Sequence, residues 1–267
     1  MTVYADNAAT TQMSDSVLKA MMPLLTDIYG NPSSLHSVGQ IAKEHLEAAR
    51  ETVAECIGAD PKEIYFTSGG SEADNQAIRS AAYIGARKGK KHIISSKFEH
   101  HAVLHTLDAL KKEGFTVTLL DVYSNGIVKP EDVANAITDE TCLVTIMTAN
   151  NEIGTIQPIA EIGRICKEKG VLFHTDAVQA VGHIPVNVKD MNCDMLSVSA
   201  HKFHGPKGVG FLYARKGILL TNIIYGGAQE RNKRAGTENM AFLLSVWQQP
   251  LRMLQTIFKK MPKRLPQ

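Results

Sequence analysis

The chain has 267 residues, of which 44% are hydrophobic and 21% are charged, and its formal net charge is +2. This composition excludes a disordered chain and allows one large core, or one large domain with a small companion. The near-neutral balance argues against a nucleic-acid-binding protein, which normally carries a basic face. No apolar run is long enough to cross a bilayer and the opening residues lack a signal-peptide organisation, so we expect a cytoplasmic protein without a membrane partner.

Two helical patterns come first in the chain, over residues 14–29 and 36–57. From about residue 60 onward, short apolar runs alternate with amphipathic ones. We expect strands over residues 63–67, 92–96, 116–122, 143–149, 171–175, 195–199 and 210–214. Helices are expected between them, over residues 71–88, 101–112, 130–137 and 159–169. The alternation predicts an α/β fold with a mostly parallel seven-stranded sheet flanked by helices, in which ligands bind beyond the carboxyl ends of the strands.

The four cysteines are scattered, with no CxxC pair and no spacing typical of a metal site. In a reducing compartment such cysteines are free thiols. Two of them, Cys56 and Cys166, lie in expected helices and Cys142 opens an expected strand, which indicates a packing role, and none of the four is chosen as a nucleophile. They are Cys56, Cys142, Cys166 and Cys193.

A Gly pair follows the first expected strand, in the segment TSGGSEADN of residues 67–75. Ser71 stands where a helix N-cap belongs, with acidic residues in the first turn. The free backbone N–H groups and the helix dipole at such a junction suit a phosphate. The segment is not a Walker A loop, and an ordinary capped turn explains it equally well.

Two further strand ends carry ionisable side chains. Asp176 closes an apolar strand in HTDAVQ, where a carboxylate needs a cationic partner such as the protonated pyridine nitrogen of pyridoxal 5′-phosphate (PLP), or serves as an N-cap. Lys202 follows the strand 195–199 in SVSAHKFHGPKG, where its pKa can fall and make the amine nucleophilic, or it is an exposed loop lysine. Ser199 and His201 beside it can donate to phosphate oxygens.

Two polar pairs complete the pattern. EHHAV places His100 and His101 after the strand 92–96, where an imidazole can stack on a ring or move protons, or can simply open the next helix. TANNEIG places Asn150 and Asn151 at another strand end, where an amide can bind a phenolate oxygen, or form a turn. Together these groups are the parts of a PLP site on consecutive strand ends of one sheet.

The same segments carry a family resemblance. YADNAATT, GNPSS, FTSGGSEADN, EHHAV, NNEIG, HTDAVQ, SAHKFHGPKG and RAGTEN stand in the order and spacing found in cysteine desulfurases. The chain therefore resembles this class V aminotransferase branch of PLP fold type I, up to about residue 239. The resemblance implies that Lys202 holds the cofactor, that His100 stacks on its ring and moves protons, and that Asp176 pairs with the ring nitrogen.

The resemblance also assigns the remaining contacts. Gln179 and Asn151 would bind near the cofactor O3′ atom. A threonine matching Thr237 reaches the phosphate of the other subunit, which implies a homodimer, with Arg234 and Glu238 at the same interface. The phosphate donors implied by the resemblance are Gly70, Ser71, Ser199 and His201.

The activity implied is conversion of L-cysteine to L-alanine with sulfur left on the enzyme, for iron–sulfur cluster assembly or thio-modification. An iron–sulfur scaffold or another sulfur-acceptor protein would then be a partner.

The resemblance stops before a small C-terminal domain, which in the family supplies a catalytic cysteine and an arginine for the substrate carboxylate. We therefore expect a truncated chain with an N-terminal arm over residues 1–15, a PLP-binding large domain over 16–245 and a divergent tail over 246–267. Three alternatives follow: an impaired desulfurase, an inactive PLP-binding or interaction protein of that family, or a nucleotide-binding α/β domain without PLP. The last requires the segment around Lys202 to be coincidental.

Overall fold

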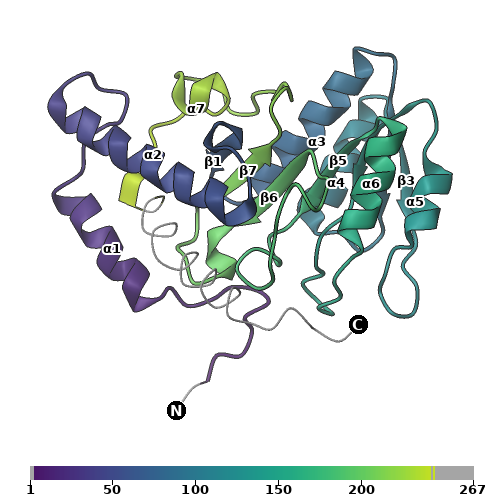
Figure 1. Ribbon diagram of the computed structural model, residues 1–267, viewed down its shortest axis with the longest axis horizontal. Coiled ribbons are helices and arrows are strands. Elements are labelled where there is room, and N and C mark those ends of the chain that lie inside the picture. Colours follow the sequence, from purple (N-terminus) through teal and green to yellow (C-terminus); the bar gives the residue numbers. More distant parts are fainter. Residues whose placement is uncertain (1–2, 242, 244–267) are drawn as a thin grey trace.

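The structure is a computed structural model that describes residues 3–241 and residue 243 (Figure 1). The expected tail 246–267 and the last residues of the expected large domain lie outside this range. No helix within the described range has both the length and the apolar character needed to span a membrane.

Seven strands form one sheet, in the order β1-β7-β6-β5-β4-β2-β3. Strand β7 runs antiparallel to both of its neighbours, β1 and β6, and every other pairing is parallel. The expected mostly parallel α/β sheet is therefore confirmed. The strands are β1 (Ile64–Thr67), β2 (His92–Ser96), β3 (Thr116–Leu120), β4 (Thr141–Thr145), β5 (Leu172–Asp176), β6 (Met195–Ser199) and β7 (Gly210–Ala214).

The six expected helices are present, with bounds that differ by a few residues, and one further short helix was not expected. They are α1 (Asp15–Thr26), α2 (Ser37–Ile57), α3 (Gly70–Ala86), α4 (His101–Lys112), α5 (Pro130–Ala136), α6 (Ile159–Lys169) and the short α7 (Gln229–Asn232). Two 3₁₀ turns accompany them, η1 (Pro61–Glu63) and η2 (Ala200–Lys202). Helices α2 and α6 lie in front of the sheet in Figure 1 and α3 lies behind it, so both faces are covered.

Two local expectations were wrong. Ser71 is not the N-cap of α3, because the helix begins at Gly70 and the cap position belongs to Gly69, whose φ of +144° favours glycine. The strand expected over 143–149 ends at Thr145. Beyond that point the chain still follows β5, with Thr148 N donating to Asp176 O at 2.8 Å, but it leaves the regular ladder.

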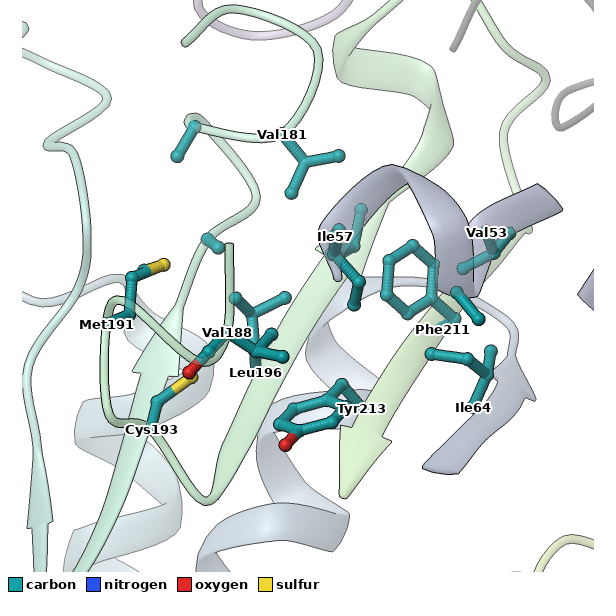
Figure 2. Packing of buried hydrophobic residues seen from close by; sticks show 14 of the residues in the cluster. Val53, Ile57, Ile64, Val181, Val188, Met191, Cys193, Leu196, Phe211 and Tyr213 are labelled. Carbon is teal, nitrogen blue, oxygen red and sulfur yellow. The ribbon is translucent and has the colours of Figure 1, made fainter. Parts of the chain in front are cut away.

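The sheet carries a hydrophobic core on each face. Val53 and Ile57 of α2 pack on Phe211 of β7 and Ile64 of β1, as Figure 2 shows. Leu212, next to Phe211, belongs instead to the core beneath α3 and α4 on the other face. Consecutive strand residues point to opposite faces, so this alternation confirms burial on both sides. Burying each such side chain stabilises the fold by about 1.5–3 kcal/mol.

Candidate active site

A cavity of about 450 Å³ lies at the carboxyl ends of the parallel strands. Its volume is in the range of small-molecule sites. Nine of the ten site residues expected from the sequence line it, namely Gly70, Ser71, His100, Asn151, Asp176, Gln179, Ser199, His201 and Lys202. The tenth, Thr237, lies in a neighbouring hollow of about 210 Å³ that also touches Ser68 and Gly208 of the main cavity.

The β1–α3 junction forms one end of the cavity. A side chain at Gly70 would bring its Cβ to 2.6 Å from Val178 Cγ2, so this close approach requires glycine. The first turn of the 17-residue α3 presents N–H groups that have no partner within the helix. Ser199 lies beside this turn, because a Cβ at Gly69 would lie 3.4 Å from its hydroxyl. These donors and the helix dipole suit an anion such as a phosphate.

Asp176 lies in the cavity wall at the end of β5 and is only 5% exposed. Its Oδ1 accepts the Val178 N–H at 2.9 Å and so stabilises a turn, but the alternative of a helix N-cap was wrong, because no helix of the described chain begins there. Burial raises the pKa of Asp176, while the Val178 N–H and the charges of His100 and Lys202 oppose that rise. Across the described part of the chain, no ion pair reaches this carboxylate. A buried carboxylate in that position calls for a cationic ligand.

Lys202 reaches the same cavity from η2, directly after β6. Its Nζ donates to the backbone oxygens of Ala8 and Ala9, the latter at 3.0 Å. Burial lowers the pKa of Lys202, although the negative charges of Asp176, Asp6 and Glu152 act in the opposite direction. A lysine with a lowered pKa has more of the free amine, which is the nucleophilic form.

The N-terminal arm covers this part of the site. Thr11 donates its backbone N–H to His201 O at 2.9 Å and accepts the His204 N–H on its hydroxyl at 2.7 Å. The Thr10 hydroxyl lies 3.0 Å from Nδ1 of His201. These contacts between segments far apart in the sequence fix η2, and with it the lysine, against the arm.

His100 caps α4 and lines the cavity at the same time. Its Nδ1 accepts the Ala102 N–H at 3.1 Å, so a neutral ring carries its proton on Nε2, an assignment made from the hydrogen bond. On the other rim, Gln179 donates to Ala8 O at 2.9 Å and Asn151 donates to Glu152 at 2.7 Å. His100 therefore does cap a helix and Asn151 does lie in a turn, and both residues also line the cavity.

Three ionisable cavity residues were not singled out from the sequence, namely Glu72, Asp74 and Lys207. Asp74 of α3 is 1% exposed. It lies four residues after Gly70, so both lie on one face of the helix, and this spacing could have indicated from the sequence that Asp74 lines the same cavity. Lys207 is exposed on the rim, and a lysine after a Gly-Pro turn carries no sequence signal of its own.

The residues around Thr237 form the neighbouring hollow. Arg234 Nε pairs with Glu72 at 3.0 Å, which ties this segment to the first turn of α3. Burial raises the pKa of Glu238, and its Oε2 is buried without a hydrogen-bond partner in the described structure. Thr237 itself is exposed and stands next to the cavity without entering it.

A mostly parallel sheet of this order, with a lysine, a buried aspartate and a glycine-rich helix start around one cavity, defines the α/β class known as PLP fold type I. A family profile described as aminotransferase class-V matches residues 3–249. Among solved structures, a "NIFS-like protein" aligns with a TM-score of 0.93 and 43% identity, over 97% of this chain and 71% of that one. A structure described as "SspA in complex with cysteine" aligns with a TM-score of 0.90 and 39% identity, over 97% and 77%.

Sequence comparison with curated relatives indicates the same family. The cysteine desulfurase IscS of Clostridium botulinum (strain Hall) is 57% identical over 244 residues, which are 91% of this chain and 61% of the relative. The cysteine desulfurase IscS of Methanosarcina thermophila is 55% identical over 238 residues, 89% of this chain and 59% of the relative. The chain belongs to the cysteine desulfurase family within the PLP-dependent class V aminotransferases, and it spans about three fifths of the length of these relatives.

Proposed function

We propose that this chain holds PLP and provides the cofactor-binding part of a cysteine desulfurase that acts on L-cysteine. The observation that carries the proposal is the presence, in the wall of one cavity, of Lys202 and of a buried Asp176 that forms no ion pair with any described residue. The first supplies an amine for the cofactor aldehyde, and the second supplies a negative charge for its ring nitrogen. Gly70, Ser71 and Ser199 provide phosphate donors at the β1–α3 end.

The other assigned residues have complementary tasks. Gln179 and Asn151 provide amide groups for the O3′ side of the ring, and His201 adds a ring nitrogen to the phosphate end. Exposed Thr237 lies outside this cavity and is proposed to reach the phosphate site of a second copy, as part of a homodimer. Arg234 and Glu238 would lie at that interface.

When bound, PLP supplies an electron-accepting ring that stabilises negative charge on the substrate carbon next to the amine. Asp176 would hold the ring nitrogen, and its negative charge would favour the protonated ring. Lys202 would hold the cofactor through its amine, and its free Nζ would be a base within the same cavity, placed to take a proton from that carbon. His100 Nε2 carries a proton that can pass to or from the reacting group.

The sulfur step needs a thiolate, and the described part of the chain offers none at the site. None of Cys56, Cys142, Cys166 and Cys193 lines the cavity, and the last three are buried. Burial raises the pKa of Cys142 to about 11 and that of Cys166 to about 12, and raises that of Cys193 as well. We therefore propose that the chain alone is an impaired desulfurase, with L-alanine and sulfur for iron–sulfur assembly or thio-modification as products only when a sulfur-accepting cysteine is supplied.

The placement of the cysteines also favours a second candidate, an inactive PLP-binding or interaction protein of the same family. Recording the visible absorption of the protein with PLP, before and after L-cysteine is added, tests both. A band that requires Lys202 and changes with L-cysteine supports the cofactor site and substrate access. Sulfide released by the chain alone would overturn the inactive alternative, and the absence of any band would overturn the cofactor proposal.

A further inference from the structure

Asp74 is a second carboxyl group in the wall of the proposed cofactor cavity. It extends from α3 and is 1% exposed, while Asp176 at the end of β5 is 5% exposed. One ligand atom from each of Asp74, Asp176 and His100 lies within 4.8 Å of the other two. Two carboxylates this close in a water-poor wall repel each other strongly, so the site favours ionisation of only one of them.

Within the described structure, no lysine or arginine pairs with Asp74. Its Oδ1 has no hydrogen-bond partner there, and Nε2 of His174 lies 3.6 Å away. His174 is fully buried, and burial lowers its pKa to about 3, so its imidazole is neutral. Its two nitrogens contact hydroxyls, Nδ1 that of Thr145 at 2.8 Å and Nε2 that of Ser197 at 2.9 Å.

The two carboxyl groups therefore lie in unequal environments. Burial raises the pKa of Asp74, the nearby Asp176 raises it further, and a hydrogen bond from Ser197 lowers it only in part. At Asp176 the Val178 N–H and the charges of His100 and Lys202 oppose the effect of burial. Environments that separate the pKa values of two neighbouring acids assign the proton to one and the charge to the other. The ionisable groups facing Asp74 from the neighbouring elements are Asp176, His174, Glu99 and His100, whereas the charge of Lys202 acts on Asp176.

We propose that Asp74 is a positioning residue that keeps its proton and donates it toward Asp176, so that the negative charge of the cavity wall stays on Asp176. A neutral carboxyl group has one O–H donor, and the unpartnered Oδ1 is free to carry it. A donor directed at Asp176 lowers the proton affinity of that carboxylate, which then leaves the proton on the ring nitrogen. The inference rests on the proposed cofactor site and adds a residue to it.

The test compares two neutral replacements in the full chain. Asp74→Asn keeps a neutral group with N–H donors, whereas Asp74→Leu has a similar size and no donor. With PLP, we expect Asp74→Asn to bind within about threefold of the wild type, and Asp74→Leu to bind at least about tenfold more weakly. The pH titration of the visible band should be wild-type-like in Asp74→Asn and displaced in Asp74→Leu. Equal weakening in both variants, or no weakening in Asp74→Leu, would overturn the proposal.

Two outcomes of this experiment distinguish a failure of the Asp74 proposal from a failure of the proposed function. If the wild-type chain binds no PLP, the proposed function fails and the positioning role fails with it. If the wild type binds PLP and the variants match it, only the role of Asp74 fails.

Without cofactor, Asp74→Asn should lose less stability than the wild type as pH rises above about 4, because folding no longer retains a proton at that position. Parallel stability curves would overturn the claim that Asp74 keeps its proton.

Discussion

Arg50 and Glu230 lie 180 positions apart in sequence and form a buried two-pronged ion pair, with Nη1 2.8 Å from Oε2 and Nη2 2.9 Å from Oε1. The same arginine donates to Ile64 O at 2.9 Å, and the same glutamate accepts the Phe66 N–H at 2.8 Å. The pair thus joins α2 to β1 and to the segment that leads to Thr237. This segment needs a firm anchor, because residues 230–232 all have positive φ.

Replacing Arg50 by Met should destabilise the protein by about 3–5 kcal/mol, because it leaves the Glu230 carboxylate buried without its cationic partner. Urea unfolding followed by circular dichroism measures the loss. The matched control is Arg50→Met combined with Glu230→Gln, which removes the buried charge and should recover part of the stability. A single variant within about 0.5 kcal/mol of the wild type would show that the pair contributes little.

Glu99 gives a prediction about pH. It is 5% exposed, and its Oε1 accepts the Ser96 hydroxyl at 2.5 Å and the Met147 N–H at 3.0 Å. Burial raises its pKa to about 8, against the effect of these two donors, and the charge of Asp176 adds to the rise. The unfolded chain gives up this proton near about pH 4.5, so the folded state loses stability as pH rises from about 4.5 to about 8.

Glu99→Gln should therefore gain stability relative to the wild type over that interval, by roughly 3–5 kcal/mol at about pH 8, and the gain should stay constant above it. Urea unfolding at about pH 5, 7 and 9 provides the comparison. Glu161→Gln, an exposed position on α6, serves as the control and should change stability by less than about 0.5 kcal/mol at each pH. The prediction fails if the Glu99 variant shows no dependence on pH relative to that control.

The thiols should differ in reactivity. Cys56 is partly exposed, whereas Cys142, Cys166 and Cys193 are buried, and burial raises the pKa of each of these three. Because the thiolate is the reactive form, a thiol reagent such as DTNB should modify at most Cys56 quickly in the folded protein and all four only after unfolding. Cys56→Ser removes the fast phase if this account is right. Rapid reaction of a second thiol in that variant would contradict it.

Those parts of the candidate site could be predicted from the sequence in which an ionisable residue directly follows an apolar strand. Asp176 and Lys202 follow apolar strands, and parallel strands collect ligands at their carboxyl ends, so the sequence pattern alone places both residues at one site. Asp74 was missed because an acid near a helix start is equally explained by the helix dipole, and only the folded sheet brings it next to Asp176. The link between Arg50 and Glu230 depends on tertiary contact and leaves no local pattern in the sequence.

The most direct test of the central claim is to find which lysine binds the cofactor. Sodium borohydride reduces a bond between PLP and a lysine to a stable amine, and peptide mass spectrometry then locates the label. Lys202 and Lys207 both line the cavity, so Lys202→Ala and Lys207→Ala form a matched pair. We predict a label on Lys202 in the wild type and in Lys207→Ala, and none in the cavity of Lys202→Ala. A label on Lys207, or one spread evenly over surface lysines, would contradict the proposed site.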